Sequence, residues 1–461
     1  MFGVKLVTAA AAAVLVMACA GPAPVLADTI EAALVRAYQN NPQLNATRAQ
    51  VRAVDEGVPQ ALSGYRPKVN LTASAGYSYT DAQTAPATPA LHGAQRPRSV
   101  GLTVNQTLYN GQQTANGVRK AEANVSGQRE ALRVLEQQVL LQAATIYMDY
   151  LRDAAIVEVQ RSNTRVLEQT LKQTRDRFNV GEVTRTDVAQ SEAQLAAGRT
   201  QQLTAEANLT ATRSNFRRII GNDPENLAPG SPVDRYLPPT LQQSIETALT
   251  ESPSVTAAMF GIDVQFLDVK IKEGALLPTV TVQASATQSY ETALTSYRAF
   301  NAAATAQLNV PIYQGGAEYS LIRQSKENLA QQRLALEQTR DQARSDVVSA
   351  WGKLLAGKAQ VQSAQAQVSA SEIALNGVRE EAKAGQRTTL DVLNAQQALV
   401  NARVSLVTAQ HDRVVASYSV LQTVGRLSPQ VLNLPTTTYD PSVHYQQIRD
   451  SWAGVRTPDG R

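Results

Sequence analysis

Four segments of the chain alternate between apolar and polar residues with the period of two that is typical of β-strands. The first places Val69 and Leu71 on one face and Asn70 and Thr72 on the other. The segments are 68–80, 98–109, 278–290 and 300–311. Each has about the length that a tilted membrane strand requires, roughly ten residues. Taken alone, the strands are also compatible with two half-buried hairpins of a soluble sheet.

Two further regions predict unusually long helices. All 20 prolines lie outside residues 98–223 and 312–428, which together make up more than half of the chain. Apolar residues there recur at heptad spacing, as in helices that pack along their whole length. We expect long helices over 112–178 and 316–382, followed by return helices over 187–220 and 391–424. The first would be roughly 100 Å long at 1.5 Å per residue, and it is too polar to lie in lipid.

The chain contains an internal repeat. Tyr109-Asn110-Gly111 returns as Tyr313-Gln314-Gly315, 204 positions later, and Ile220-Gly221 returns as Val424-Gly425 at the same spacing. Two tandem repeats are therefore expected, over 28–221 and 241–425, each with short helices, two strands, a long helix and a return helix. A proline-rich linker, 222–240, separates them. A tail over 426–461 without a clear pattern is expected to wrap the helices in part and to be disordered at its end.

Each long helix is followed by a tight reversal. In the first repeat the turn contains Val180, Gly181 and Thr184. The glycine suits a left-handed helix end, and either Thr184 or Thr186 suits the start of the next helix. The corresponding turn of the second repeat contains its own glycine and threonine. Its residues are Ala384, Gly385 and Thr388.

The first 27 residues predict an export signal. Lys5 precedes an apolar run that is too short to span a bilayer, and small residues lead to a cleavage site after Ala27. The alternative is a lipoprotein acylated at Cys19, the one cysteine of the chain. With cleavage after Ala27 the exported protein has no cysteine, so a disulfide and a thiolate metal site are excluded.

Composition and charge exclude other classes of protein. The net charge of +4 is spread thinly along the chain, so we expect no nucleic-acid partner. The three histidines are far apart in the sequence, and neither Gly-Lys pair is followed by the serine or threonine of a phosphate-binding loop. We therefore expect neither an enzyme nor a cofactor.

Four strands cannot close a barrel, and an open sheet edge is not viable in lipid. Several copies must pool their strands, and three copies would supply twelve. The count alone also allows two or four copies. The competing interpretation is a soluble periplasmic coiled-coil scaffold with a small β domain.

The sequence resembles the TolC family of outer-membrane efflux and type I secretion channels over nearly all of its exported part. The turn sequence Arg177-Phe178-Asn179-Val180-Gly181 and the segment Gly385 to Leu393 carry the resemblance, together with the doubled order of strands and helices. The resemblance implies a mainly α-helical homotrimer, in which a 12-strand β-barrel in the outer-membrane lipid continues as a 12-helix periplasmic α-barrel. It further implies a passive exit duct that opens on docking to a periplasmic adaptor protein and an inner-membrane transporter of the ABC or RND type.

The resemblance also assigns roles to residues near the two turns. Asp187 and Arg387 match a polar network that closes such channels at the periplasmic tip, and Asp391 matches an acidic ring of the pore. Asn394 stands where a second aspartate is often found, so one acidic ring is expected. The two turns, with Gly181 and Gly385, would be the surfaces that an adaptor grips. The cargo stays open between drugs, a secreted protein and a polysaccharide.

Overall fold

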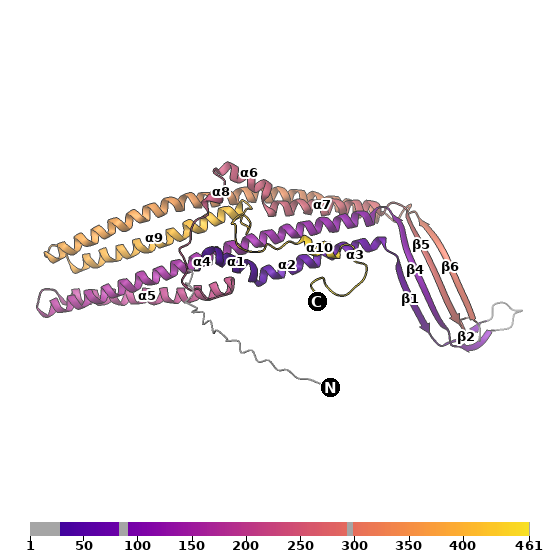
Figure 1. Cartoon of the computed structure of the whole chain (residues 1–461), viewed down its shortest axis with the longest axis horizontal. Coiled ribbons are helices and arrows are strands. Elements are labelled where there is room, and N and C mark those ends of the chain that lie inside the picture. Colours follow the sequence, from indigo (N-terminus) through magenta and orange to yellow (C-terminus); the bar gives the residue numbers. More distant parts are fainter. Residues whose placement is uncertain (1–27, 83–90, 293–297, 461) are drawn as a thin grey trace, which may run out of the picture.

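The protein is elongated, with a sheet at one end and two helical hairpins at the other (Figure 1). The computed structural model describes residues 28–82, 91–292 and 298–460. The predicted signal, with Ala27 and Cys19, lies outside the described residues. Within them, no helix is both long and apolar enough to cross a membrane.

The first repeat begins with three short helices and continues through four strands into a helical hairpin. Its elements are α1 (Ile30–Asn40), α2 (Pro42–Asp55), α3 (Gly57–Leu62), the 3₁₀ turn η1 (Ser63–Tyr65), β1 (Lys68–Ala75), β2 (Ser78–Ala82), β3 (Leu91–Gln95), β4 (Arg98–Asn110), α4 (Gln113–Asn179) and α5 (Arg185–Ile220).

The second repeat has the same order with fewer short elements. After the 3₁₀ turn η2 (Asp234–Tyr236), its elements are α6 (Leu241–Glu251), α7 (Pro253–Gly274), β5 (Thr279–Tyr290), β6 (Arg298–Asn309), α8 (Ala317–Lys383) and α9 (Thr389–Thr423), and the tail adds α10 (Ser442–Ile448).

The four long strands form one antiparallel sheet in the order β1-β4-β5-β6. The continuous strand expected over 68–80 is wrong in one respect, because the structure divides it at Gly76 and Tyr77. Residues Ser78 to Thr80 of the predicted strand belong instead to β2, which pairs with β3 as a separate two-stranded ribbon. Both outer strands of the main sheet, β1 and β6, have one edge without a strand partner among the described residues.

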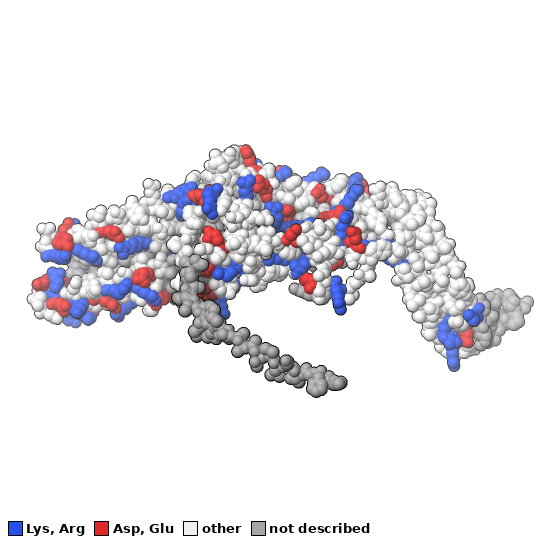
Figure 2. Space-filling model, in the orientation of Figure 1, with Lys and Arg blue, Asp and Glu red and all other residues white. Residues whose placement is uncertain are grey.

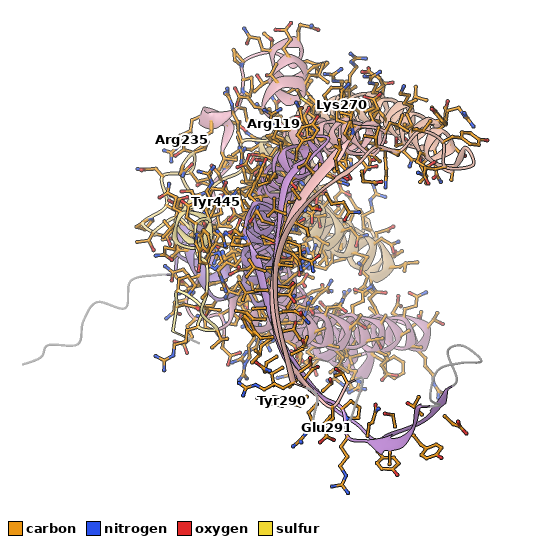
Figure 3. The ribbon with its side chains drawn as sticks, turned by 90° about the vertical axis from the view of Figure 1, so that its right-hand side faces the viewer. Arg119, Arg235, Lys270, Tyr290, Glu291 and Tyr445 are labelled. Atoms are coloured by element: carbon orange, nitrogen blue, oxygen red, sulfur yellow. The ribbon has the colours of Figure 1, made fainter. Side chains whose placement is uncertain are left out.

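The two faces of the sheet differ in chemistry, as the register shows. One row across the four strands consists of Leu71, Leu102, Ala286 and Ala302, each directly opposite the next. One face of the sheet therefore carries apolar residues across all four strands. The other face is polar, and on it the hydroxyl oxygens of Ser74 and Ser99 are 2.8 Å apart. The apolar face is uncovered in the single chain, and the sheet is curved (Figure 3). Leu71 keeps 74% of its surface exposed.

The long helices α4 and α8 form the body of the molecule and are both 67 residues long. Each begins after a residue with left-handed backbone, Gln112 for α4 and Gly316 for α8. α5 folds back along α4, and α9 folds back along α8, so the two hairpins lie side by side (Figure 1). α4 and α9 make the main contact between them.

The largest apolar core lies midway along the helices. Leu34, Leu140, Phe216 and Leu421 meet there, so both repeats contribute to it. Tyr147 is fully buried, and its hydroxyl proton is shared between the carbonyl oxygens of Asp28 and Ala228, at 2.7 and 2.6 Å. The start of the described chain and the linker are thereby joined to α4.

The tail packs against this body. Leu427, Leu432 and Leu434 are buried in the same core, and α10 reaches α2 and α4. There the buried Asp55 carboxylate lies 3.1 Å from Nδ1 of His444 and 3.7 Å from a guanidinium nitrogen of Arg129. Burial raises the pKa of Asp55 despite these two partners.

We expect the junction between sheet and helices to depend on Gly111. Its φ is +62°, and an added Cβ would lie 2.2 Å from the carbonyl oxygen of Gly274. Gly111→Ala should therefore lower the thermal midpoint of the purified protein strongly, because strain and a backbone clash combine. Gly117→Ala is the matched control, since Gly117 is helical with open space around it and should gain about 0.5–1 kcal/mol of stability. Equal melting of the two variants would contradict this assignment.

Candidate functional site: the tips of the two helical hairpins

The first tip is a tight reversal fixed by backbone and side-chain caps. Gly181 adopts φ +85°, and its amide and that of Glu182 close the end of α4 on the carbonyl oxygens of Phe178 and Arg177. The next helix begins in a reciprocal capping box. The Asp187 amide donates to the Thr184 hydroxyl at 3.3 Å, and the Thr184 amide donates to the Asp187 carboxylate at 2.9 Å.

The second tip repeats this geometry. Gly385 adopts φ +79°, and its amide donates to the carbonyl oxygen of Ala382 at 3.1 Å. The Asp391 amide donates to the Thr388 hydroxyl at 3.2 Å, and the Thr388 amide returns a hydrogen bond of 3.0 Å to Asp391. Two turns with the same hydrogen-bonding pattern thus lie at this end of the molecule.

Both capping aspartates are held in the charged form. Hydrogen bonds from the Thr184 hydroxyl and amide lower the pKa of Asp187, and those from the Thr388 amide and hydroxyl do the same for Asp391. Arg387 is exposed, and its Nε donates to the Glu381 carboxylate at 2.8 Å, which raises the pKa of Arg387. The tips consequently carry fixed charges of both signs, as Figure 2 also shows.

Within one chain, the four residues expected at the gate are divided between the two tips. Asp187 belongs to the first tip, whereas Arg387, Asp391 and Asn394 belong to the second, and the tips lie apart (Figure 1). Arg387 pairs with Glu381 of its own hairpin rather than with Asp187. Asn394 is exposed one turn after Asp391. Within one chain, Asp187 and Arg387 are therefore not in contact.

A buried polar contact that the sequence does not predict joins the two hairpins near the tips. The buried Gln396 side chain of α9 donates to Asn163 of α4 at 3.3 Å and accepts from Arg379 of α8 at 2.9 Å. Leu393 packs beside it on Leu167, Leu171 and Leu195. Heptad spacing gives the apolar part of such a seam, but a buried glutamine among many exposed ones has no sequence signature.

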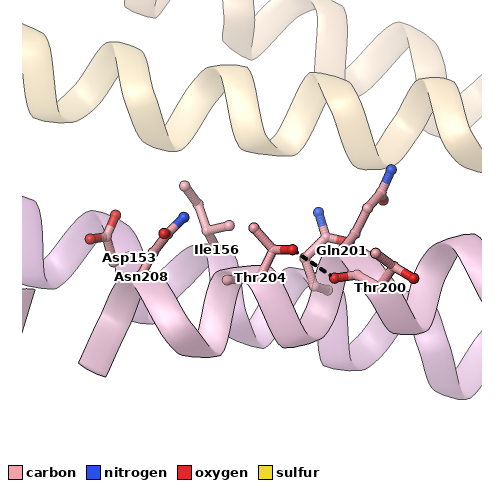
Figure 4. A pocket seen from close by; sticks show the side chains of 8 residues that line it. Asp153, Ile156, Thr200, Gln201, Thr204 and Asn208 are labelled. Atoms are coloured by element: carbon pink, nitrogen blue, oxygen red, sulfur yellow. Dashed lines mark hydrogen bonds between the residues drawn. The ribbon is translucent and has the colours of Figure 1, made fainter. Parts of the chain in front are cut away.

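A small hollow of about 260 Å³ lies between α4 and α5, facing α9 (Figure 4). Asp153, Gln160 and Asn208 are among its lining residues, and the Thr204 hydroxyl donates to the carbonyl oxygen of Thr200 at 2.9 Å. No group of three or more His, Cys, Asp or Glu residues in the described ranges could hold a metal ion.

One known protein family matches the chain twice, once for each helical hairpin and its strands. The model of the outer membrane efflux protein family matches residues 33–222 and matches again over residues 244–426, one match for each repeat. The chain belongs to the outer membrane efflux protein family.

Individual members of the family are similar over nearly the whole length. Outer membrane efflux protein BepC of Brucella suis is 40% identical over 437 residues, covering 95% of this chain and 94% of the relative. Outer membrane protein TolC of Vibrio cholerae is 27% identical over 405 residues, covering 86% of this chain and 90% of that protein. The solved CmeC outer membrane channel of Campylobacter jejuni superposes with a TM-score of 0.77 at 16% identity, over 91% of this chain and 89% of that one.

This efflux protein is accordingly an exit duct of the cell outer membrane whose helices extend into the periplasm. The interpretation as a soluble periplasmic scaffold is excluded by family membership. The family consists of channel proteins rather than enzymes. The tips are the part of the molecule farthest from the sheet (Figure 1).

Proposed function

We propose that three copies of the chain form one duct, with a closed 12-strand barrel in the outer membrane and a 12-helix tunnel in the periplasm. The observation that supports this most strongly is the incomplete sheet. Its apolar face is uncovered across four strands, and β1 and β6 each have one edge without a strand partner in the part of the chain that the structure describes. Lipid accepts the apolar face but not the edges, so the edges must pair between copies.

The helices support the same assembly. Leu334 and Ile373 on α8 and Leu203 on α5 remain largely exposed in the single chain, at 72%, 72% and 64%. Such residues on long helices are covered when helices of neighbouring copies pack against them. Three copies of α4–α5 and α8–α9 would then surround the tunnel.

The tips serve as gate and docking surface in this proposal. Arg387 leaves Glu381 and pairs with Asp187 of the partner subunit in the resting duct, while Asp391 forms a single acidic ring with Asn394 one turn away. Val180, Gly181 and Thr184, with Ala384, Gly385 and Thr388, form the surface that a periplasmic adaptor grips. The adaptor belongs to an inner-membrane transporter of the ABC or RND type, and that transporter supplies the energy.

The gate predicts a change in conductance. Arg387→Ser should raise the single-channel conductance of the purified duct in planar bilayers, because the charged link between copies is lost. Glu381→Gln removes only the partner of Arg387 within its own hairpin, so it should leave the closed conductance at or below the unmodified value. Arg403→Ser, which breaks an exposed 2.7 Å ion pair to Glu372 in the same hairpin but outside the proposed gate, is the matched control and should change nothing. Unchanged conductance in Arg387→Ser would remove this residue from the gate.

The docking surface predicts a loss of export without a loss of assembly. Leucine at Gly181 and Gly385 would enter left-handed backbone and distort the turns, although no atom lies within 4 Å of either added Cβ. Export measured in cells with the cognate transporter should fall while assembly and membrane insertion persist. Gly377→Leu, at a helical glycine with equally open surroundings, should export normally. Normal export from the doubly substituted protein would show that docking occurs elsewhere.

A further inference from the structure

Two arginines and a tyrosine form a straight row across three strands at the end of the sheet farthest from the helices. Arg98 of β4 lies directly opposite Tyr290 of β5, and Tyr290 lies directly opposite Arg298 of β6. Residues directly opposite in register point to the same face, so the three side chains share one side of the sheet. All three are exposed, and Tyr290 is seen at the far end of the sheet in Figure 3.

The row lies on the apolar face. One row nearer the helices, Val100 is opposite Gln288, and Gln288 is opposite Phe300. Along β1, β4, β5 and β6 as described, Arg98 and Arg298 are the only charged residues on this face. Lys68, at the other end of the sheet, belongs to the polar face, because it pairs with Asn105. In Figure 2 the sheet surface is correspondingly uncharged up to its far end.

Neither arginine has an acidic partner among the described residues. The Arg298 guanidinium lies 5.8 Å from the centre of the Tyr290 ring, a cation–π contact that holds it at the row. The nearby Glu291 carboxylate is engaged by the backbone amide of Arg96 at 3.2 Å. The row therefore presents two positive charges whose hydrogen-bond donors remain available to a ligand.

The position of the row fits one boundary of a membrane. From Tyr290 to Val280, which lies opposite Tyr109 near the helices, β5 advances by about 33 Å along the strand at roughly 3.3 Å per residue. With a strand tilt of about 40°, the band between the two rows is about 25 Å tall, the height of the apolar band of membrane barrels. Tyr109 marks the periplasmic boundary, and the arginine row marks the outer one.

We propose that Arg98, Tyr290 and Arg298 form a binding site for the phosphate groups of a phosphorylated glycolipid in the outer leaflet. The inference rests on the proposed function, because only a barrel whose apolar face meets lipid places the row at that leaflet. Guanidinium groups bind phosphate oxygens in a bidentate manner, and the acyl chains of the same lipid lie against Val100 and Phe300. A trimer carries three such sites on its outer circumference.

The spacing of the row suits a lipid with more than one phosphate. β4 and β6 are separated by two inter-strand distances, so the backbones of Arg98 and Arg298 are about 10 Å apart. Both side chains are long enough to reach a common headgroup between them or a phosphate each. Tyr290 supplies an amphipathic ring at the same level, as aromatic residues do at membrane interfaces.

The test is lipid retention by the full-length assembly in detergent, measured by native mass spectrometry. The probes are bisphosphorylated lipid A, lipid A with both phosphates removed, and inorganic phosphate as competitor. The protein should bind the bisphosphorylated lipid about tenfold more tightly than the dephosphorylated one. Arg98→Gln/Arg298→Gln should lose this preference. Lys68→Gln is the matched control, a basic residue of the same sheet on the opposite face, and should keep it.

Three results would overturn the proposal. These are equal affinity for the two lipids, an unchanged preference in the double variant, and displacement of the lipid by millimolar inorganic phosphate, which would indicate a site for free anions. Insertion into liposomes is measured in parallel for every variant. If the unmodified protein inserts normally but binds the two lipids equally, only this inference fails. If the unmodified protein does not insert, the proposed function itself fails.

Discussion

An unfinished sheet is the constraint on which the rest of this structure depends. The strand order β1-β4-β5-β6 gives one face that water does not favour and two edges that lipid does not tolerate. Alternating residues set the face, and the antiparallel register aligns it across both repeats. Within the described residues, a single copy thus leaves two strand edges without a strand partner, and the proposed association of copies pairs them.

Duplication explains how one chain builds two similar arms with different tips. The turns at Gly181 and Gly385 share backbone geometry, glycine, threonine cap and capping aspartate. They differ in the order of their charges: Arg177 precedes the first turn and pairs with Glu182 after it, whereas Glu381 precedes the second turn and pairs with Arg387 after it. The common features fix the shape of the tips, and the differing ones allow the two tips to make unlike contacts when copies meet.

The long helices could be predicted from the sequence because the features that define them are local. Absence of proline, heptad spacing and the Gly–Thr turns locate α4, α5, α8 and α9 to within a few residues. The break at Gly76 and the β2–β3 ribbon were missed, since alternation continues through a bend that only backbone geometry reveals. The buried leucines of the tail and the contact between Gln396 and Asn163 were also missed, because both depend on neighbours distant in the sequence.

At the candidate site, the turns and their capping residues could be predicted from the sequence, because those interactions span only a few positions. The partner of Arg387 could not be predicted in the same way, because an exposed guanidinium has several carboxylates within reach. Within its own hairpin the partner is Glu381. In the proposed assembly the charges of the gate pair between copies, so the contacts within one chain do not include that pairing.

The number of copies in the assembled duct tests the central claim most directly. The mass of the detergent-solubilised protein, obtained by light scattering with the detergent contribution subtracted, should equal three chains, and no folded monomer should persist in detergent-free buffer. A stable, folded monomer in water without lipid would contradict the account, because its sheet would then need neither lipid nor a neighbouring copy.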